Sequence, residues 1–288
     1  MRYCPSCRSV IASGTWSCPR CKWFAEIRNG IPVLAPHAER EDDGFSPEQF
    51  KTLFELEPEN FWFRARNVLI LWALNRYFPS ARRILEIGCG TGYVLSAIGA
   101  ARPGATVVGS ELFAEGAVFA ARRVKNGEII QMDARDMPFE EEFDVLGAFD
   151  VIEHIEDDKR VLLEAHRALR AAGGLIVTVP QHPSLWSAAD QFAFHKRRYT
   201  RAELLTKVRE AGFRVLCCTS FVTLLHPLML LSRIRQRSEE KFDPLAEFRI
   251  HRASNWIFEK IMAAERLFIR AGMRLPFGGS LLLVAVKI

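Results

Sequence analysis

The chain has 288 residues, of which 49% are hydrophobic and 25% are charged, with a net charge of +5 at neutral pH. This is the balance of an ordinary globular protein. No apolar run approaches the roughly 20 residues of a membrane-spanning helix, and no apolar segment follows the first residues as in a secretory signal. We therefore expect a cytoplasmic protein with reduced thiols. The mild basicity suits phosphate-bearing partners or an anionic membrane surface without requiring either.

Residues 1–36 form a cysteine-rich unit with two C-x-x-C pairs separated by ten residues. Two such turns present four thiolates tetrahedrally, which is the ligand set of structural Zn²⁺ and leaves no open position for catalysis. The predicted zinc ligands are Cys4, Cys7, Cys18 and Cys21. A unit this short needs the metal to fold. The polar residues 37–47 are predicted to be a linker.

From residue 48 onward, apolar strand-like runs alternate with helical periodicity, which favours a parallel sheet covered on both faces. Strands are expected at 83–87, 106–110, 128–132, 143–149, 174–179, 214–219 and 280–286, and helices at 59–77, 92–101, 113–125, 157–171 and 200–211. The sequence thus predicts a doubly wound α/β fold with a mostly parallel, seven-stranded sheet. The last two strands are expected to form an antiparallel pair at its edge. The predicted domains are a core at 48–219, a helical insertion at 220–279 and a final core strand at 280–288.

A glycine-rich loop, Gly88 to Gly92, lies between the first predicted core strand and the next helix. Glycines permit a tight turn and close approach of a ligand, and the helix N-terminus offers N–H donors to a carboxylate. The spacing G-x-G-x-G differs from the G-x-G-x-x-G of dinucleotide sites, and Glu86 precedes the first glycine by two residues. Glu111 follows the next predicted strand, about twenty residues beyond the loop, where an acid can hold ribose hydroxyls. Asp133 follows the third strand and can accept from an adenine amino group.

Together and in this order, these residues resemble class I S-adenosylmethionine (SAM)-dependent methyltransferases over residues 60–219 and the last strand. The segment from Phe149 to Ile155 is similar to the fourth motif of ubiquinone-biosynthesis O-methyltransferases. The resemblance implies SAM as cofactor, with its methionine part on Glu86 and the loop, its ribose on Glu111 and its adenine beside Asp133. The implied cofactor-binding residues are Glu86, Gly88, Cys89, Gly90, Gly92, Glu111, Leu112, Asp133, Ala134 and Asp150.

Four polar residues after the fourth and fifth core strands are the predicted catalytic residues. They are Asp150, Glu153, His154 and His195. In one interpretation a histidine is the general base for an acceptor hydroxyl. In another, all four hold a Mg²⁺-like ion, similar to metal-dependent O-methyltransferases with an E-x-x-E-H…H pattern, although Asp150 shortens the reach of the first acid. In a third interpretation, these four residues have a purely structural role.

The insertion bears on the class of acceptor, because residues 221–231 are nearly all apolar and arginines follow at 233, 235 and 237. Such a segment either roofs a pocket for a small hydrophobic acceptor or lies in a membrane interface. Both favour O-methylation of a hydrophobic or lipid-linked small molecule, with peripheral contact at the inner membrane face through 221–237 as the second possibility. Nucleic-acid channels need dispersed cations and stacking aromatics instead.

Two further functions are weighed against this one. The ribbon resembles the zinc-binding N-terminus of certain rRNA guanine methyltransferases and the zinc-ribbon activator subunit of some methyltransferases, which implies a ribbon-guided rRNA or tRNA methyltransferase. A non-catalytic zinc-ribbon binding protein on an idle scaffold is the third alternative.

Phe61 to Asn67 is predicted either to close over the cofactor or acceptor, or to pack as an amphipathic helix. Arg197 and Arg198 are predicted to be phosphate ligands or exposed charges.

Overall fold

The computed structural model describes residues 1–12, 14–38, 47–236 and 250–288. Most of the predicted linker at 37–47 therefore lies outside the described residues. Among the described residues, none of the helices combines the length and the apolar character needed to cross a membrane.

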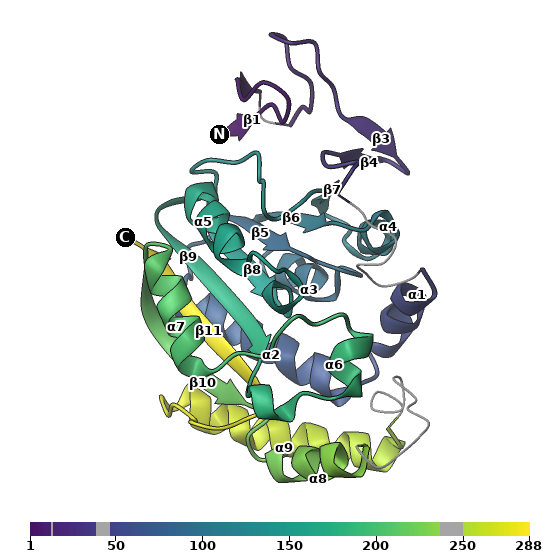
Figure 1. Ribbon diagram of the computed structural model, residues 1–288, viewed down its shortest axis with the longest axis vertical. Coiled ribbons are helices and arrows are strands. Elements are labelled where there is room, and N and C mark those ends of the chain that lie inside the picture. The colour runs from purple at the N-terminus through teal and green to yellow at the C-terminus, as the bar shows by residue number, and fades with distance from the viewer. Residues whose placement is uncertain (13, 39–46, 237–249) are drawn as a thin grey trace.

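A single large sheet organises the described residues, with nine strands in the order β10-β11-β9-β8-β5-β6-β7-β4-β3 (Figure 1). Seven of them form the predicted mostly parallel core sheet, in which β11 runs antiparallel to both β9 and β10. The edge pair is thus antiparallel as predicted, with β10 outermost. The seven strands are β5 (Arg83–Ile87), β6 (Thr106–Glu111), β7 (Gly127–Gln131), β8 (Phe143–Phe149), β9 (Leu169–Pro180), β10 (Phe213–Phe221) and β11 (Ser280–Lys287).

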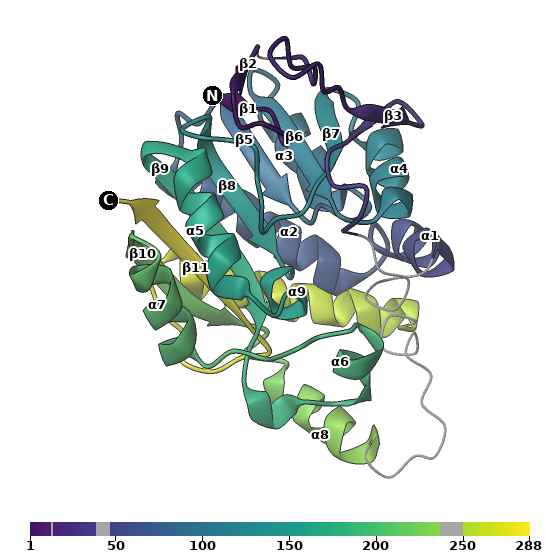
Figure 2. The ribbon, with the colours of Figure 1, turned by 45° about the horizontal axis from the view of Figure 1, so that its top comes forward.

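Helices cover both faces of this sheet, and each layer encloses a hydrophobic core (Figures 1 and 2). One face is covered by α2 (Phe61–Tyr77), α3 (Tyr93–Ala101), α4 (Ala114–Arg123) and α9 (Arg252–Arg270). The other face carries α5 (Asp158–Ala168), α7 (Arg201–Glu210) and the N-terminal ribbon. The remaining helices are α1 (Pro47–Leu56), α6 (Ala188–Phe192), α8 (His226–Gln236) and the 3-10 turns η1 (Ile152–His154) and η2 (Pro183–Leu185).

One predicted boundary is wrong. The helix expected at 157–171 ends at Ala168, and β9 begins at Leu169 instead of residue 174. Leu169 is fully buried and pairs with Phe143 of β8. Burial in the sheet therefore overrides the helix preference of the Leu-Arg-Ala-Ala run. The other predicted core helices begin and end within two residues of their predicted bounds.

The ribbon does not stand apart from the sheet. Its short strands β1 (Arg2–Tyr3) and β2 (Val10–Ile11) pair with each other. The following hairpin, β3 (Glu26–Arg28) and β4 (Ile31–Val33), joins the core sheet through the pair Val33 and Gln131. This extends the sheet beyond β7 by two strands.

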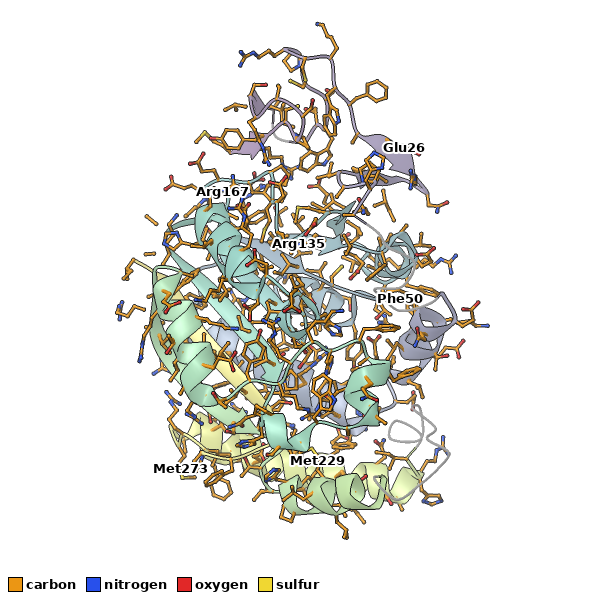
Figure 3. The ribbon with its side chains drawn as sticks, viewed as in Figure 1. Glu26, Phe50, Arg135, Arg167, Met229 and Met273 are labelled. Atoms are coloured by element: carbon orange, nitrogen blue, oxygen red, sulfur yellow. The ribbon has the colours of Figure 1, made fainter. Side chains whose placement is uncertain are left out.

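The insertion after β10 forms α8 and α9 at the end of the molecule opposite the ribbon (Figure 2). Met229 and Met273 lie at this end and Glu26 at the other (Figure 3). Glu265 of α9 is fully buried, and its carboxylate accepts from the backbone N–H groups of Val222, Thr223 and Leu224 at 2.6–2.9 Å. One carboxylate thus fixes the chain between β10 and α8 to α9.

Candidate active site

The loop after β5 has the left-handed backbone that its glycines allow. Gly88, Gly90 and Gly92 all have φ between 53° and 76°, a region costly for residues with a side chain. A Cβ on Gly88 would also lie 2.7 Å from the Val151 side chain. Gly92 precedes the first turn of α3, so the loop delivers the chain to a helix N-terminus facing a cavity.

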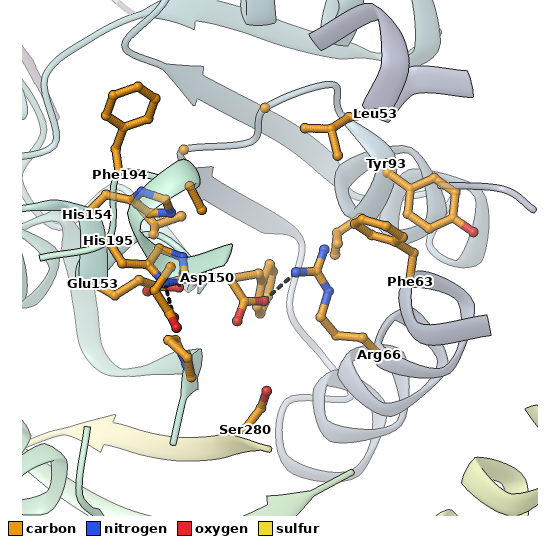
Figure 4. A pocket seen from close by; sticks show the side chains of 18 of the residues that line it. Leu53, Phe63, Arg66, Tyr93, Asp150, Glu153, His154, Phe194, His195 and Ser280 are labelled. Atoms are coloured by element: carbon orange, nitrogen blue, oxygen red, sulfur yellow. Dashed lines mark hydrogen bonds and ion pairs between the residues drawn. The ribbon is translucent and has the colours of Figure 1, made fainter. Parts of the chain in front are cut away.

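This cavity, of about 1020 Å³, lies at the carboxyl ends of the core strands. All ten predicted cofactor-binding residues except Gly92 line it, as do all four predicted catalytic residues. Side chains from the insertion complete the wall on one side, and Phe61, Trp62, Phe63 and Arg66 from α2 contribute as well. Figure 4 shows the two sides of this cavity, with Arg66 opposite His195.

Three of the predicted cofactor-binding acids, Glu86, Glu111 and Asp133, occupy distinct environments. Glu86 is 3% exposed, and burial raises the pKa of its carboxyl well above the ordinary value. Its Oε2 is buried without a hydrogen-bond partner. The Glu111 carboxylate accepts from the N–H groups of Gly90 at 2.7 Å and Leu112 at 2.9 Å, which ties the loop to β6. Asp133 pairs with Arg135 at 2.7 Å.

The orphaned Glu86 oxygen is the observation that tests whether SAM fits. A buried polar atom without a partner is costly and rare, and this one faces the cavity beside the glycine loop. An ammonium group brought to it would satisfy it and favour its ionised form. The α-ammonium of a methionine moiety meets this requirement, so the residues present fit SAM.

Asp150 stands apart from the other predicted catalytic residues. Its backbone is left-handed (φ 57°), and its carboxylate accepts from Arg66 and from Thr178 Oγ1 at 2.9 Å (Figure 4). The guanidinium of Arg66 lies 4.5 Å from the Trp62 ring centre. Residues of the segment 61–67 therefore line the cavity at the start of the packed helix α2, and closure of this segment over a cofactor or acceptor stays a prediction.

Glu153, His154 and His195 converge, with ligand atoms all within 4.8 Å of one another. Both Glu153 oxygens are buried without a hydrogen-bond partner, and burial raises the pKa of this carboxyl well above its ordinary value. Burial and the nearby His195 lower the pKa of His154 to about 3. The structure thus brings together three of the four residues predicted as metal ligands or catalytic groups, and Arg66 holds Asp150 away from them.

Sequence reasoning missed Asp190, which positions His195. Asp190 Oδ1 lies 2.8 Å from His195 Nδ1 and 2.8 Å from Arg198 Nε. Arg198, predicted as an exposed charge or a phosphate ligand, is instead 7% exposed and engaged with this acid. Burial opposes ionisation of Asp190, but His195 and Arg198 outweigh it and lower its pKa to about 2. The capping box from Ser187 to Asp190 was the available signal.

A second missed group braces the glycine loop. Glu57, 7% exposed, accepts from Thr91 Oγ1 and from Arg123. Arg123 also bonds the Thr91 hydroxyl and the carbonyl of Phe54, both at 2.6 Å. The loop is therefore held from α1 and α4 as well as by Glu111.

The four predicted zinc ligands form one cluster. Cys4 and Cys21 Sγ lie 3.6 Å apart, as do Cys7 and Cys18 Sγ, and all four sulfurs lie within 4.8 Å. Four sulfurs about 2.3 Å from a tetrahedral centre have edges of about 3.8 Å, so this cluster has the size of a Zn²⁺ site. Arg8 and Lys22, each following the second cysteine of its pair, share a left-handed backbone, so the two turns are alike.

The fold and loop define a nucleoside-binding α/β protein of the methyltransferase class, and comparisons with known proteins agree. A family model described as a methyltransferase domain matches residues 85–177. A probable SAM-dependent methyltransferase of Mycobacterium tuberculosis is 30% identical over 200 residues, covering 63% of this chain and 70% of that protein. The ubiquinone biosynthesis O-methyltransferase of Pseudomonas syringae pv. tomato is 29% identical over 145 residues, covering 48% of this chain and 58% of that protein.

Solved structures show the same fold. Phosphoethanolamine N-methyltransferase 2 of Haemonchus contortus, in complex with SAM, matches 84% of this chain and 57% of its own, with a TM-score of 0.54 and 21% identity. A chain from the complex between a Haloferax volcanii methyltransferase activator and a methyltransferase matches with a TM-score of 0.53 and 19% identity, over 84% of this chain and 93% of its own. The chain belongs to the SAM-dependent methyltransferases.

Proposed function

We propose that this methyltransferase acts on a hydroxyl group of a hydrophobic or lipid-linked small molecule. The observation that carries the proposal is an apolar wall that the insertion contributes to the same cavity as the cluster of Glu153, His154 and His195. This wall consists of Val222, Leu225, Leu228, Met229, Ile250 and Phe258. Pockets for apolar ligands pair such walls with a few polar groups that fix orientation.

The cofactor half of the cavity is proposed to hold SAM as follows. Glu86 takes the α-ammonium, and N–H groups of the loop and of the α3 N-terminus take the carboxylate. Glu111 turns from the Gly90 amide to the ribose hydroxyls, and Asp133 lies beside the adenine. SAM supplies an electrophilic methyl group, and the surrounding residues align the acceptor oxygen with it.

His195 is the proposed general base. Ionised Asp190 holds a proton on His195 Nδ1, which leaves Nε2 to accept the proton of the acceptor hydroxyl. Nε2 lies 4.0 Å from Glu153 Oε1, beyond hydrogen-bond distance. His154 is the weaker choice because a pKa of about 3 makes it a poor proton acceptor.

A metal-assisted reaction is the second route through the same residues. Two imidazoles and one carboxylate resemble the donor sets of transition metals more than the all-oxygen surroundings of Mg²⁺. Turnover that does not depend on added Mg²⁺ would favour His195 acting alone. Separately, Cys4, Cys7, Cys18 and Cys21 are proposed to hold a structural Zn²⁺, because their spacing and sulfur distances fit it.

Mass spectrometry of a cell extract incubated with SAM, with and without the enzyme, tests the proposed function. We expect a gain of one methyl group on an apolar metabolite or lipid. A gain on RNA nucleosides instead would overturn the acceptor class and favour the ribbon-guided RNA enzyme.

Two variants separate cofactor binding from chemistry. Glu111→Ala should abolish binding of S-adenosylhomocysteine in calorimetry, since its carboxylate is proposed to hold the ribose. His195→Gln should keep that binding and lower turnover by about 10²–10⁴-fold, the usual contribution of a general base. Equal loss of binding in both variants would contradict the assigned roles.

A further inference from the structure

The exposed apolar surface of the molecule is concentrated on the insertion. Ten of the seventeen large hydrophobic side chains that are exposed in the described residues lie between 224 and 277. We call this set the cap face: Leu224, Leu228, Leu230, Leu231, Trp256, Ile257, Leu267, Phe268, Met273 and Phe277. Large exposed apolar patches on monomeric globular proteins commonly mark a binding surface.

The helical spacing shows that the apolar face of α9 is additional to its packing face. Met262, Glu265 and Ile269 are buried, and they recur at the steps of three and four that define one side of a helix. Trp256 is 60% exposed and Leu267 is 64% exposed, and both lie on the opposite side. In α8, Leu228 and Leu231 are likewise exposed three residues apart.

Along α9 and the turn that follows it, the exposed charges have one sign. Between residues 252 and 274, every exposed charged side chain is basic. These are Arg252, Lys260, Arg270 and Arg274. Of the two acids in this stretch, Glu259 pairs with Arg64 at 2.6 Å and Glu265 is buried. Lys260 lies 5.6 Å from the Trp256 ring centre, which places a cation beside the most exposed aromatic of the helix.

We propose that the cap face docks onto the headgroup region of an anionic lipid bilayer. Apolar side chains with flanking cations partition into that interface, where the chains contact the acyl boundary and the cations contact anionic headgroups. Tryptophan with a neighbouring lysine is typical of this depth. Exposed apolar residues alone would suit many partners, and the exposed basic side chains at 252–274 favour a negatively charged one.

The cap face continues into the active-site cavity. Leu228 is 48% exposed and also lines the cavity, and Met229 beside it lines the same wall. A membrane-resident acceptor would therefore pass from the bilayer to the methyl donor along one apolar surface. This delivery route rests on the proposed function, whereas docking itself requires neither SAM nor an acceptor.

Co-sedimentation of the full zinc-loaded chain with vesicles tests the docking. We expect binding to phosphatidylcholine vesicles that contain phosphatidylglycerol, and weaker binding to phosphatidylcholine alone or at high salt. Leu267→Ser with Trp256→Ser should lower the partition coefficient at least about tenfold. Lys260→Gln should lower it roughly fivefold, and only on the anionic vesicles.

Phe24→Ser and Ile27→Ser are the matched controls. Both residues are exposed and apolar, at 73% and 60%, but they belong to the ribbon end, so vesicle binding should not change. Equal loss in these controls, or no binding to anionic vesicles, would overturn the proposal. So would a dimer in light scattering that Leu267→Ser dissociates, since the face would then be covered by a second copy. These measurements need no substrate, so their failure would leave the proposed reaction untouched.

Discussion

The ribbon and the insertion, at opposite ends of the molecule, are attached to the same core by different kinds of contact (Figure 1). The ribbon is anchored through Arg2, which is 3% exposed and bonds Glu128 and Glu142 of the core. Trp16 Nε1 donates to the same Glu128 at 2.9 Å. The insertion is anchored largely by apolar contact between α2 and α9, such as Phe61 against Phe258 with ring centres 5.2 Å apart.

The ribbon and the insertion also contribute to the active-site cavity by different kinds of contact. Ala35, which follows the last ribbon strand, is hydrogen-bonded to Gln131. The Gln131 side chain accepts from the N–H of Ala35 and donates to the carbonyls of Ala35 and Leu112. His37 and Ala38, just beyond, line the cavity. The ribbon thus supports the proposed adenine side of the cavity with specific hydrogen bonds. The insertion forms the proposed acceptor side with apolar side chains and leaves much of its outer surface exposed.

The largest expected effect is loss of the proposed zinc ligands. Cys4→Ser with Cys18→Ser should abolish zinc binding and remove on the order of 10 kcal/mol from the local stability of the ribbon, if metal binding supplies its folding free energy as proposed. Native-state hydrogen exchange should show loss of protection at residues 2–28 and retained protection in β5. Ser6→Ala, within the first knuckle but not a ligand, is the control. A ribbon that stays protected without zinc would contradict a metal-dependent fold.

The second largest loss of stability is expected at Arg2, the buried anchor of the ribbon. Arg2→Ala removes the Arg2 guanidinium from Glu128 and from Glu142, which is 4% exposed and keeps its pair with Arg83. The change should lower the free energy of unfolding by about 1.5–3 kcal/mol in urea denaturation, the usual range for hydrogen bonds to charged groups. Arg8→Ala is the matched control, because Arg8 also bridges the ribbon to the core, but its pair with Asp136 is solvent-exposed. That variant should change stability by less than about 1 kcal/mol. Similar losses in both would show that burial does not set the strength of the anchor.

The same anchor should give a pH dependence. Burial opposes ionisation of Glu128, but the hydrogen bond and charge of Arg2 outweigh it and lower the pKa of this carboxyl. A lowered folded-state pKa contributes stability above the unfolded value, about 4.3, which is lost as the pH falls through the folded value. The stability difference between wild type and Arg2→Ala should therefore shrink below about pH 4.3. A difference that is constant down to acid unfolding would contradict this linkage.

These long-range anchors could not be predicted from the sequence. The core strands, the glycine loop and the paired cysteines are local patterns, and each was predicted from spacing alone. Arg2 meets Glu142 across 140 positions and Arg66 meets Asp150 across 84. Hydrophobic periodicity along the chain does not predict ion pairs between residues this far apart in the sequence. Asp190 is near His195 in sequence, yet their contact depends on an irregular turn, which pattern reasoning does not resolve.

On the insertion, Glu265→Gln should have a moderate effect. The change keeps the shape of the side chain but weakens its three backbone hydrogen bonds, and should cost about 1–3 kcal/mol. Because this contact fixes the chain at residues 222–224, hydrogen exchange should rise in α8 and leave the ribbon unchanged. Increased exchange in β7 and the ribbon would mean that the two ends are coupled.

The smallest expected effect is that of Leu267→Ala, which is compared with Ile269→Ala to separate the two faces of α9. Ile269 is fully buried and Leu267, two residues earlier, is 64% exposed. Ile269→Ala should cost about 2–5 kcal/mol through the cavity it leaves, whereas Leu267→Ala should change the free energy of unfolding by no more than about 0.5 kcal/mol. If Leu267→Ala costs as much as Ile269→Ala, the outer face of α9 packs within the protein and is not available to a membrane. If it costs nothing, selection for folding alone does not account for a leucine at that position.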